Sequence, residues 1–489
     1  MAKRGPLIAP HGHRRHLSAS IYAITRPWVF ILLAVVLLVS IIIIHSRRGL
    51  HVELGLRVSQ APLMDLTPSE VYQEAPVHLA KMFPPPDPVR KNYDEWNSRT
   101  LLDLHACMAL NRCGPNQKKV ALLAAHWFEE AIVRGWRGGE GVWAVSVHKH
   151  LRAMGYTTFF ANSFDEALKQ YRMFPELVKV VIRNKAGECH SDPKCVKGPD
   201  NPSGIPAWKI FDFEFFVSHG NHFHASLMKG KWILSANPDN KPQDPGPIQY
   251  IGYSLEDECR QIEPLRLAQR AHRAWMLMKQ LTYVYDSAFA WNRSYFSLAH
   301  HSPELSELVF AGGWMIDQHY QWKPEKGILT DIEDPANGVV NFGRLDPKQF
   351  LEAVRMSKVM VGMGNPWWSP SPYVALCLGV PFVNPIRNWD RQDPWNKTKW
   401  HTQHPSLNGY DPPYVYHVHK GDYEGFIKAV KAASITEIPS FIPPHMTEFV
   451  VRERVRNLIE TDWKALAAEL LEERLEERKS GKKAYVFEL

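Results

Sequence analysis

The stretch at residues 359–385 constrains the fold more than any other part of the chain. It begins with an apolar run typical of a buried strand, passes through a loop rich in Gly, Pro and Ser, and continues as a short helix that ends at Gly379 before a second strand. A strand, loop, helix and strand in this order form one unit of a parallel α/β sheet. Such units bind ligands where the strands end, and Ser369 and Ser371 would add hydroxyl donors for a phosphate there. An ordinary turn in any doubly wound domain is the simpler interpretation.

Short motifs in and after this stretch resemble one enzyme family. They are Gly362 and Gly364, Pro370-Ser371-Pro372, Ala375, Gly379, Phe382-Val383-Asn384-Pro385 and Gln403-His404-Pro405. In this order they are similar to the donor-nucleotide region of glycosyltransferase family 18, the alpha-1,6-mannosylglycoprotein 6-beta-N-acetylglucosaminyltransferases (N-acetylglucosaminyltransferase V and relatives). The resemblance is dense over residues 348–415, thin over residues 118–160 and poor in between.

The resemblance implies an α/β fold of the GT-B-like type, in which two Rossmann-like domains face a cleft. We therefore expect an N-terminal acceptor and catalytic-base domain at residues 116–270 and a C-terminal nucleotide-sugar domain at residues 271–440. Residues 441–489 would contain a C-terminal helix that packs back on the N-terminal domain, and its apolar face is consistent with such packing. A free coiled-coil tail is the alternative for this last segment.

The pattern of apolar residues and turn signals predicts alternating strands and helices in both domains. In the first domain we expect strands at residues 118–126, 157–161 and 178–182 and helices at residues 140–154 and 164–171. In the second we expect strands at residues 281–285 and 339–342 and another that begins at Val359. Asp346, Pro347 and Gln349 form a capping box with proline in the first turn, which predicts a helix start.

Residues 28–44 are uncharged and almost all apolar. As a helix they would be about 25 Å long, which suits a short membrane span. Five Lys/Arg residues precede this segment and two follow it, so the positive-inside rule places residues 1–27 in the cytosol. We predict a signal-anchored, single-pass type II protein of the Golgi or endoplasmic reticulum membrane, with residues 45–115 as a stem and a lumenal catalytic region. A cleaved signal peptide competes with this interpretation, but the bulky run at residues 41–44 offers no small-residue cleavage site.

The net charge of +7 comes from the N-terminal segment, because seven Lys/Arg residues precede the first acidic residue, Glu53. The remainder of the chain is formally neutral and lacks the basic face that a nucleic-acid backbone requires, so we exclude nucleic acid as a partner. The expected partners are a nucleotide sugar, a glycan or glycoprotein acceptor, and the membrane through residues 28–44.

Cysteines and sequons fit a lumenal compartment. Two pairs of cysteines, each six residues apart, are candidates for small disulfide rings in an oxidising environment. Cys377 lies on the apolar helix after the Pro-Ser-Pro loop and is predicted to be a buried packing residue. Two Asn-x-Ser/Thr tripeptides are candidate N-glycosylation sites. The candidate disulfide cysteines and sequon asparagines are Cys107 with Cys113, Cys189 with Cys195, Asn292 and Asn396.

Sugar transfer with inversion needs a carboxylate that takes the proton of the acceptor hydroxyl as its oxygen attacks the sugar. Glu140 lies in Gly138-Gly139-Glu140-Gly141 at a predicted loop-to-helix junction. The resembling family places its catalytic glutamate at this point, so we predict that Glu140 is the general base. Stabilisation of a helix N-terminus is the alternative role. The resemblance implies that the donor-binding residues are Gly362, Gly364, Ser369, Pro370, Ser371, Pro372, Gln403 and His404.

Two acidic positions of the family are changed here, to Trp368 before the Pro-Ser-Pro loop and to Val374 after it. Trp367 or Trp368 is a candidate for stacking on a base or sugar ring, although one of the two would then be ordinary core. The resemblance implies UDP-N-acetylglucosamine as donor and a mannose hydroxyl of a glycoprotein N-glycan as acceptor. The two changes leave open a GT-B transferase that uses another nucleotide sugar, or a non-catalytic, membrane-tethered glycan-binding relative.

The sequence offers two weak candidates for a metal site. Asp212-Phe213-Glu214 is the nearest approach to an Asp-x-Asp pair, but its alternation predicts a strand with one polar face. His219, His222 and His224 form a denser cluster that has ligand chemistry for zinc, although surface or acceptor-site histidines suit such a loop better. We predict a metal-independent enzyme with no cofactor other than its nucleotide-sugar donor.

Overall fold

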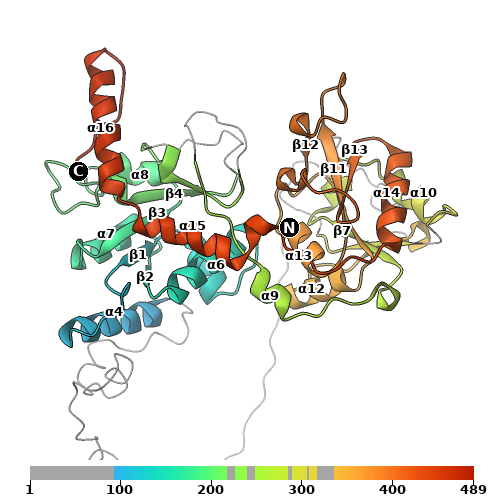
Figure 1. Cartoon of the computed structure of the whole chain (residues 1–489), viewed down its shortest axis with the longest axis horizontal. Helices are drawn as coiled ribbons and strands as arrows, with labels where there is room; N and C mark the ends of the chain where they lie inside the picture. The colour runs from blue at the N-terminus through green and yellow to red at the C-terminus, as the bar shows by residue number, and fades with distance from the viewer. Residues whose placement is uncertain are drawn as a thin grey trace, which may run out of the picture. The chain divides into compact units, whose positions relative to one another are not determined.

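The computed structural model describes residues 93–216, 226–228, 230–238, 248–284, 289–305, 308–315 and 335–489. The predicted cytosolic tail, membrane anchor and most of the predicted stem lie outside these ranges, as does the cluster of His219, His222 and His224. Within the described part of the chain, no helix is both long and apolar enough to cross a bilayer. The described strands form two mainly parallel sheets with helices packed around them, which is a mixed α/β fold (Figure 1).

The first sheet has six parallel strands in the order β2-β1-β3-β4-β5-β6. The strands are β1 Val120–Leu123, β2 Thr157–Phe160, β3 Val178–Arg183, β4 Ile210–Glu214, β5 Ile233–Ser235 and β6 Gln249–Tyr250. Helix α6 (Gly139–Ala153) connects β1 to β2, and α7 (Phe164–Met173) connects β2 to β3. All four side chains of β1 are fully buried, as expected for a central parallel strand. The strands and helices predicted between residues 118 and 182 are therefore confirmed.

The second sheet has seven strands, in the order β12-β11-β10-β7-β8-β9 with β13 also paired to β11. Only β12 runs antiparallel to its neighbour. The strands are β7 Arg273–Leu277, β8 Val309–Gly312, β9 Val339–Asn341, β10 Val359–Gly362, β11 Phe382–Asn388, β12 His401–Thr402 and β13 Val415–His419. Its helices are α10 Ser294–His300, α12 Pro347–Arg355, α13 Ser371–Cys377 and α14 Tyr423–Ile435. The strand, loop, helix and strand predicted at residues 359–385 are β10, α13 and β11.

Local signals explain several helix starts. Asp346 caps α12: its side chain accepts a hydrogen bond from Gln349 N at 2.8 Å, while the Gln349 side chain accepts from Asp346 N at 3.0 Å. This confirms the predicted capping box. Ser163 caps α7 in the same way by accepting from Glu166 N at 3.1 Å.

Two predictions about local structure are wrong. Residues 281–284 form a short 3-10 helix rather than a strand, because β7 lies earlier and fills the central position of the second sheet. The predicted stem is folded from residue 93 onward: helix α4 (Asp94–Ala109) packs against β2. Trp96 Nε1 donates to Thr158 O at 3.1 Å and Asn97 Nδ2 donates to Phe160 O at 2.9 Å, which fixes α4 to the edge strand.

All six cysteines are paired. Disulfides join Cys107 to Cys113 and Cys189 to Cys195, as predicted, and a third joins Cys259 to Cys377. The interpretation of Cys377 as a simple packing residue is therefore incomplete: it is buried, but it is also bonded to helix α9 (Glu256–Arg260). Its partner is 118 residues away, so no spacing rule pointed to it.

The chain ends in two helices rather than one, α15 (Glu448–Glu460) and α16 (Trp463–Lys479). Asp462 separates them and caps α16 by accepting from Ala465 N at 3.0 Å. Helix α15 packs against α6, and the Trp463 ring lies 4.8 Å from the Phe211 ring of β4. Arg474 donates to the carbonyls of Leu227 and Met228, so α16 also contacts the first domain.

The remaining elements are short. They are α5 His126–Phe128, a π-helix at Glu129–Val133, α8 Ala186–His190, and 3-10 helices at Ala207–Lys209, Gly230–Trp232, Leu267–Gln269, Leu281–Val284, Pro335–Asn337, Lys397–Lys399, Pro405–Leu407 and Pro444–Met446.

Candidate active site

The predicted donor loop follows β10 at the point where the strand order of the second sheet reverses. From β7 the chain passes to β8 and β9 on one side, and it returns to β10, β11 and β13 on the other. Open α/β sheets bind their ligands outside the carboxyl ends of the strands at such a reversal. β10 ends at Gly362, and its carbonyl accepts a hydrogen bond from Trp291 Nε1 at 2.7 Å. The sheet topology thus selects the same loop as the sequence motif.

Gln403 holds this loop in shape. Its side chain is fully buried, and its Oε1 accepts from Gly364 N at 2.8 Å while its Nε2 donates to Pro366 O at 3.1 Å. Its own carbonyl accepts from Trp368 N at 3.1 Å. Gly364 has φ +97°, a conformation that favours glycine. Gln403, predicted to bind the donor, is therefore placed where it determines the conformation of the donor loop.

His404 is also fully buried and bonded to protein. Its Nε2 lies 3.0 Å from the Ser369 carbonyl oxygen and its Nδ1 lies 3.0 Å from Ser406 Oγ. Because a carbonyl can only accept, Nε2 carries the proton and Nδ1 accepts from the serine hydroxyl. Burial lowers the pKa of His404 to about 3, so the ring is neutral at ordinary pH. Through the Ser369 carbonyl, His404 supports the residue that directly precedes the Pro-Ser-Pro motif.

The two tryptophans of the donor loop stack on each other. Their rings lie 4.6 Å apart and almost parallel, at 12°. Trp368 is buried, whereas Trp367 is half-buried and anchored by its Nε1 hydrogen bond to Thr402 O at 2.9 Å. Trp368 therefore matches the core interpretation, and Trp367 keeps a partly accessible ring at the loop surface.

The Pro-Ser-Pro residues begin helix α13. Pro370 is its N-cap and Pro372 is buried in its first turn. The Ser369 and Ser371 hydroxyls lie 3.1 Å apart, and Ser371 N donates to Ser369 Oγ at 3.3 Å. Helix α13 has only seven residues and no side-chain cap. The two hydroxyls are thus adjacent polar groups at the start of a very short helix.

Two cations at this carboxyl edge have no place in the sequence motif. Arg387 lies in the last part of β11, and its Cδ would be 3.7 Å from a Cβ built on Gly364, so its side chain lies beside the donor loop. Lys279 is exposed and follows β7 by two residues. Sequence reasoning missed both because neither stands in a motif, although a cation directly after a strand of a parallel sheet is a usable signal.

Glu140 occupies the first turn of α6, between closely packed glycines. A Cβ on Gly139 would lie 2.6 Å from Phe215 Cζ, and one on Gly141 would lie 2.8 Å from the Trp136 carbonyl oxygen. Small residues are therefore required on both sides of the glutamate. Within the described residues, no hydrogen bond or ion pair engages the Glu140 carboxylate, which is half-buried.

The surroundings of Glu140 come from the carboxyl edge of the first sheet, whose order reverses between β1 and β3. His126 follows β1, and Arg183 ends β3 and donates to Ala124 O at 2.6 Å. Burial lowers the pKa of His126, while the carboxylates of Glu130 and Glu140 act in the opposite direction. The sequence analysis did not select His126 or Arg183, because only the reversal brings the ends of β1 and β3 together.

Aromatic rings extend from the same edge. The His126 and Trp127 rings lie 3.9 Å apart, and the Trp127 and Trp136 rings stack at 5.1 Å. Trp136 is 37% exposed, and its ring covers the glycines beside Glu140. A partly exposed indole next to a carboxylate provides both a stacking face and a proton acceptor, which are the groups a sugar acceptor needs.

Asp212 and Glu214 form a close carboxyl pair on β4. Asp212 is fully buried; its Oδ1 accepts from Ala186 N at 3.0 Å, and its Oδ2 has no hydrogen-bond donor among the described residues. Burial, together with the neighbouring Glu214, raises the pKa of Asp212 well above its ordinary value, and burial also raises the pKa of Glu214. Burial therefore favours the protonated form of Asp212. The predicted strand is correct, but its polar face is buried rather than exposed.

This arrangement does not favour the metal role that Asp212-Phe213-Glu214 suggested. A cation at Asp212 would have to compete with the Ala186 amide for Oδ1 and would lie at a fully buried side chain. Among the described residues, no three His, Cys, Asp or Glu side chains gather as a metal site.

The segment after β6 joins α6 to α13. Ser254 N donates to Ser146 Oγ on α6 at 3.0 Å, and the Tyr253 ring lies 6.1 Å from the Tyr373 ring on α13. A few residues later the Cys259–Cys377 disulfide attaches α9 to the end of α13. One short segment thus connects the helix that begins with Glu140 to the helix that follows the donor loop.

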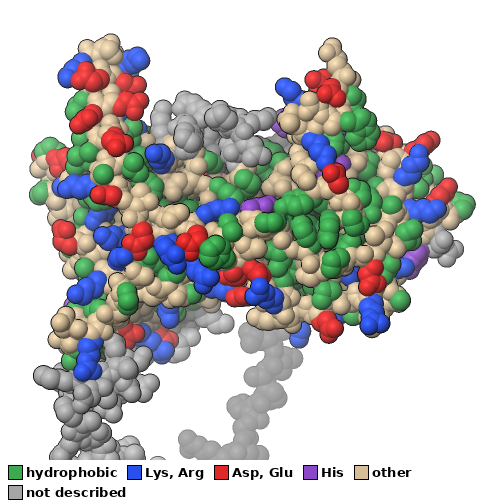
Figure 2. All heavy atoms as spheres, in the orientation of Figure 1, with side chains coloured by type: hydrophobic (Ala, Val, Ile, Leu, Met, Phe, Trp, Pro, Cys, Tyr) green, Lys and Arg blue, Asp and Glu red, His purple; other side chains and the backbone are tan. Residues whose placement is uncertain are grey.

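Both candidate glycosylation sites lie at the surface. Asn292 is exposed and its Oδ1 accepts from the Ser294 hydroxyl at 3.0 Å, while Asn396 Oδ1 accepts from the Thr398 hydroxyl at 2.6 Å. On the face drawn in Figure 2, Lys/Arg and Asp/Glu side chains are interspersed rather than gathered by sign.

Residues 330–469 match the family model for Glycosyltransferase family 18. Over these residues the chain is similar to glycosyltransferase family 18. The matched part contains the donor loop, Gln403 and His404, and the protein is accordingly a glycosyltransferase. The match begins after the first sheet, so Glu140 and the whole first domain lie outside it. No curated protein matches the chain.

Solved structures of glycosyltransferases resemble the chain only weakly. The glycosyltransferase AviGT4 of avilamycin A biosynthesis is 13% identical, with 73% of this chain and 97% of that chain covered and a TM-score of 0.38. Anabaena HepE in complex with UDP is 10% identical, with 72% and 100% covered and a TM-score of 0.37. An alpha-glucosyltransferase in complex with UDP and DNA is 8% identical, with 73% and 100% covered and a TM-score of 0.38. Scores this low carry no inference, so the fold description rests on the strand orders themselves.

Proposed function

We propose that this glycosyltransferase is an inverting, metal-independent enzyme that moves N-acetylglucosamine from UDP-N-acetylglucosamine to a mannose hydroxyl of a glycoprotein N-glycan. The observation that carries the proposal is the family 18 donor loop at the strand-order reversal of the second sheet. The family supplies the chemistry of sugar transfer, and the reversal is where a parallel sheet binds its ligand.

The donor edge would act on the diphosphate. Arg387 lies beside the loop and Lys279 follows the neighbouring strand β7, and the two cations would offset the charge of the departing UDP. The Ser369 and Ser371 hydroxyls would donate hydrogen bonds to phosphate oxygens. Trp367, with its ring fixed by the Thr402 carbonyl, would stack on the uracil or the sugar.

The other edge would act on the acceptor. The acceptor oxygen attacks the anomeric carbon of the donor sugar, the bond from that carbon to the UDP oxygen breaks, and the hydroxyl proton passes to the Glu140 carboxylate. Glu140 suits this role because it is half-buried and has no protein hydrogen bond or ion pair within the described residues. A positioned base contributes roughly 10²- to 10⁴-fold in rate. Trp136 would stack on the acceptor sugar beside it.

The GT-B-like arrangement is part of the proposal: the carboxyl edges of the two sheets would face one cleft. The segment from Tyr253 to Cys259 supports it by joining α6 to α13. The membrane anchor at residues 28–44 and a lumenal Golgi or endoplasmic reticulum location are proposed on the sequence. Three disulfides agree with an oxidising compartment.

A transfer of another sugar is the second candidate. It is favoured by Val374, an apolar side chain on α13 where the resembling family has a carboxylate that would hold the donor ribose. Loss of that carboxylate changes how the nucleotide is held without changing the fold of the loop.

A donor panel tests both candidates. The full chain is incubated with UDP-N-acetylglucosamine, UDP-glucose, UDP-galactose and GDP-mannose, with and without a mannose-terminated N-glycan and with and without EDTA. The proposal expects transfer from UDP-N-acetylglucosamine only, unaffected by EDTA, with a β-linked product by NMR. Transfer from a different donor would support the second candidate, and an α-linked or EDTA-sensitive product would contradict the mechanism.

A further inference from the structure

A polar pocket lies at the opposite end of α6 from Glu140. It is lined by Thr100, Asp103, Gly114, Pro115, Asn116, Gln117, Arg152, Met154, Gly155, Tyr156, Thr157 and Thr158. Its cavity volume is about 350 Å³, within the range of pockets that hold small molecules. Glu140 and Arg152 are twelve residues apart on one helix, or about 18 Å along its axis. The pocket is therefore separate from the candidate active site.

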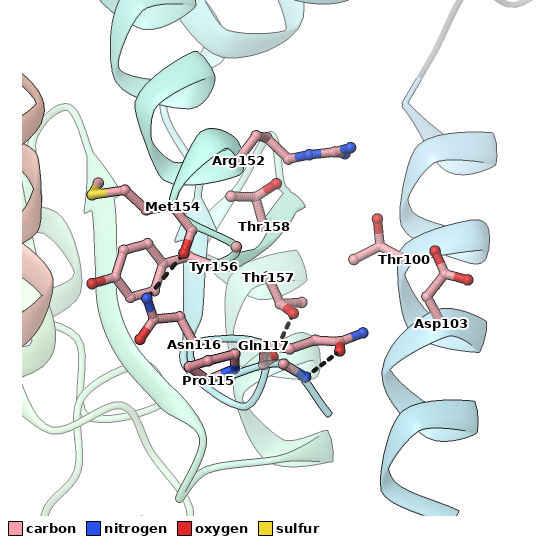
Figure 3. Close-up of a pocket in the computed structure, with 12 residues that line it drawn as sticks. Thr100, Asp103, Pro115, Asn116, Gln117, Arg152, Met154, Tyr156, Thr157 and Thr158 are labelled. Carbon is pink, nitrogen blue, oxygen red and sulfur yellow. Dashed lines mark hydrogen bonds between the residues drawn. The ribbon is translucent and has the colours of Figure 1, made fainter. Parts of the chain in front are cut away.

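The pocket has a rigid frame. The Cys107–Cys113 disulfide closes the turn between α4 and residues 114–117. That turn is held to the first sheet by two side-chain hydrogen bonds: Asn116 Nδ2 donates to Met154 O at 2.9 Å and Thr157 Oγ1 donates to Gln117 O at 2.6 Å. Both are drawn in Figure 3. A disulfide and two crossing hydrogen bonds define the wall of the pocket before any ligand enters.

Four polar side chains of the pocket, those of Thr100, Asp103, Arg152 and Thr158, make no side-chain hydrogen bond or ion pair with another described residue. Figure 3 shows Thr100 and Asp103 on α4, with Thr100 on the side that faces Thr157 and Thr158, and Arg152 reaching from the end of α6 toward α4. Thr158 is buried, and its hydroxyl has no hydrogen-bond partner among the described residues. A buried hydroxyl without a partner costs folding free energy, so its retention indicates a ligand or water at this position.

Charge within the pocket selects the class of ligand. Burial raises the pKa of Asp103, and the charge of the Arg152 guanidinium opposes that shift. The two charged groups are therefore close enough to interact across the pocket. The Arg152 guanidinium, which comes from α6, lies 4.4 Å from the Trp96 ring of α4. This contact holds the guanidinium against α4. An anion would meet the Asp103 carboxylate and a cation would meet Arg152. A neutral ligand with many hydroxyls satisfies both, together with the threonine hydroxyls and the Gln117 amide.

We infer that this pocket is a second carbohydrate-binding site, one that holds a neutral hexose or N-acetylhexosamine unit away from the site of transfer. Asp103 would accept hydrogen bonds from sugar hydroxyls, and Arg152 and Thr158 would donate to ring or hydroxyl oxygens. A separate glycan unit on the acceptor glycoprotein and a free sugar share this chemistry. The inference goes beyond the proposed transfer and does not rest on it, because sugar binding is measured at equilibrium without any donor.

Binding of methyl α-mannoside and of methyl β-N-acetylglucosaminide to the full chain tests the inference, with saturation-transfer NMR and titration calorimetry as readouts. The variants are Asp103→Ala and Thr158→Val, with His105→Ala as the control because His105 is exposed on the same helix. UDP is added at saturation, so that binding at the transfer site is held constant. Unfolding midpoints establish that each variant folds.

The expected result is that each pocket variant weakens binding of one of the two sugars at least tenfold, a change of about 1.4 kcal/mol, whereas His105→Ala does not. If the pocket binds a glycan of the acceptor glycoprotein, Asp103→Ala also raises KM for an intact glycoprotein acceptor but not for a minimal glycan acceptor. If Asp103→Ala and the wild type have equal KM values for the glycoprotein, the ligand of the pocket is a free sugar. Equal sugar affinities in all four proteins would overturn the inference. The inference would also be overturned if inorganic phosphate bound more tightly than either sugar and its binding were weakened by Asp103→Ala and Thr158→Val.

Discussion

The carboxyl edges of the two sheets are built in opposite ways. At the second sheet, Gln403 and His404 are fully buried and every hydrogen bond they make goes to the loop or its neighbours. At the first sheet, Glu140 and Trp136 are partly exposed, and within the described residues no protein group binds the Glu140 carboxylate. The edge of the second sheet has a loop whose backbone is held in shape by buried side chains. The edge of the first sheet has partly exposed side chains.

This difference suggests a division of labour. A nucleotide diphosphate is the same in every reaction cycle, so a preformed loop can bind it without reorganising. The proton of the acceptor must move, so the group that takes it needs a carboxylate oxygen that the acceptor hydroxyl can reach. Substitution of Gln403, which holds the donor loop, should therefore change stability and donor affinity together, while substitution of Glu140 should change turnover alone.

The largest expected effect is at the acceptor edge. Glu140→Gln keeps the size of the side chain but removes the proton acceptor, so kcat should fall roughly 10²- to 10⁴-fold with an unchanged unfolding midpoint. Initial rates of glycan transfer measure it. Glu472→Gln, an exposed glutamate of α16, is the control and should behave as the wild type. Turnover of Glu140→Gln within threefold of wild type would remove Glu140 from the mechanism.

At the donor edge, Gln403→Leu should reduce stability. It leaves the buried Gly364 N–H without its acceptor and removes the donor to Pro366 O, a loss of about 2–3 kcal/mol in the free energy of unfolding. Urea unfolding measures the change, with the exposed Gln392→Leu as the matched control. A variant as stable as the wild type would show that the loop does not depend on Gln403.

Arg387→Gln separates charge from loop shape. Arg387 lies beside Gly364, so its loss should raise KM for the donor roughly tenfold, because one stabilising charge near the diphosphate disappears. Donor KM at saturating acceptor is the readout. Arg456→Gln on α15 is the control for general loss of positive charge. Equal KM values in the two variants would argue that Arg387 does not contact the donor.

The smallest effect concerns pH. The folded pKa of His404 is about 3, below its value of about 6.5 in an unfolded chain. Its contribution to stability is therefore present above pH 6.5 and is lost as pH falls toward 3. Between pH 7.5 and 5.5 we expect a loss of about 1 kcal/mol from this residue. Urea unfolding of wild type and His404→Gln at both pH values measures it; an equal slope in both proteins would exclude His404 as the cause.

Sequence reasoning predicted the local structure at residues 346–385 better than the surroundings of Glu140, for a physical reason. The donor loop is rich in glycine, proline and serine, whose backbone preferences can be recognised in the sequence itself. In the same way, the capping residue Asp346 marks the start of the preceding helix, α12. Glu140 acts on the pKa of His126, and His126 lies near Arg183 because β1 and β3 are neighbours where the strand order reverses. The Cys259–Cys377 bond and the burial of Asp212 likewise follow from tertiary packing. The contacts between residues 93–109 and β2 are long-range, so no local sequence pattern distinguishes these residues from the predicted stem.

Binding of UDP tests the division between the two edges most directly. Titration calorimetry of UDP into wild type, Glu140→Gln and Gln403→Leu, below the unfolding range of each, gives three dissociation constants. We predict that Glu140→Gln binds UDP as the wild type does, within a factor of two, while Gln403→Leu binds it at least tenfold more weakly. Weakened UDP binding in Glu140→Gln, or unchanged binding in Gln403→Leu, would contradict the assignment of donor binding to the second sheet and of chemistry to the first.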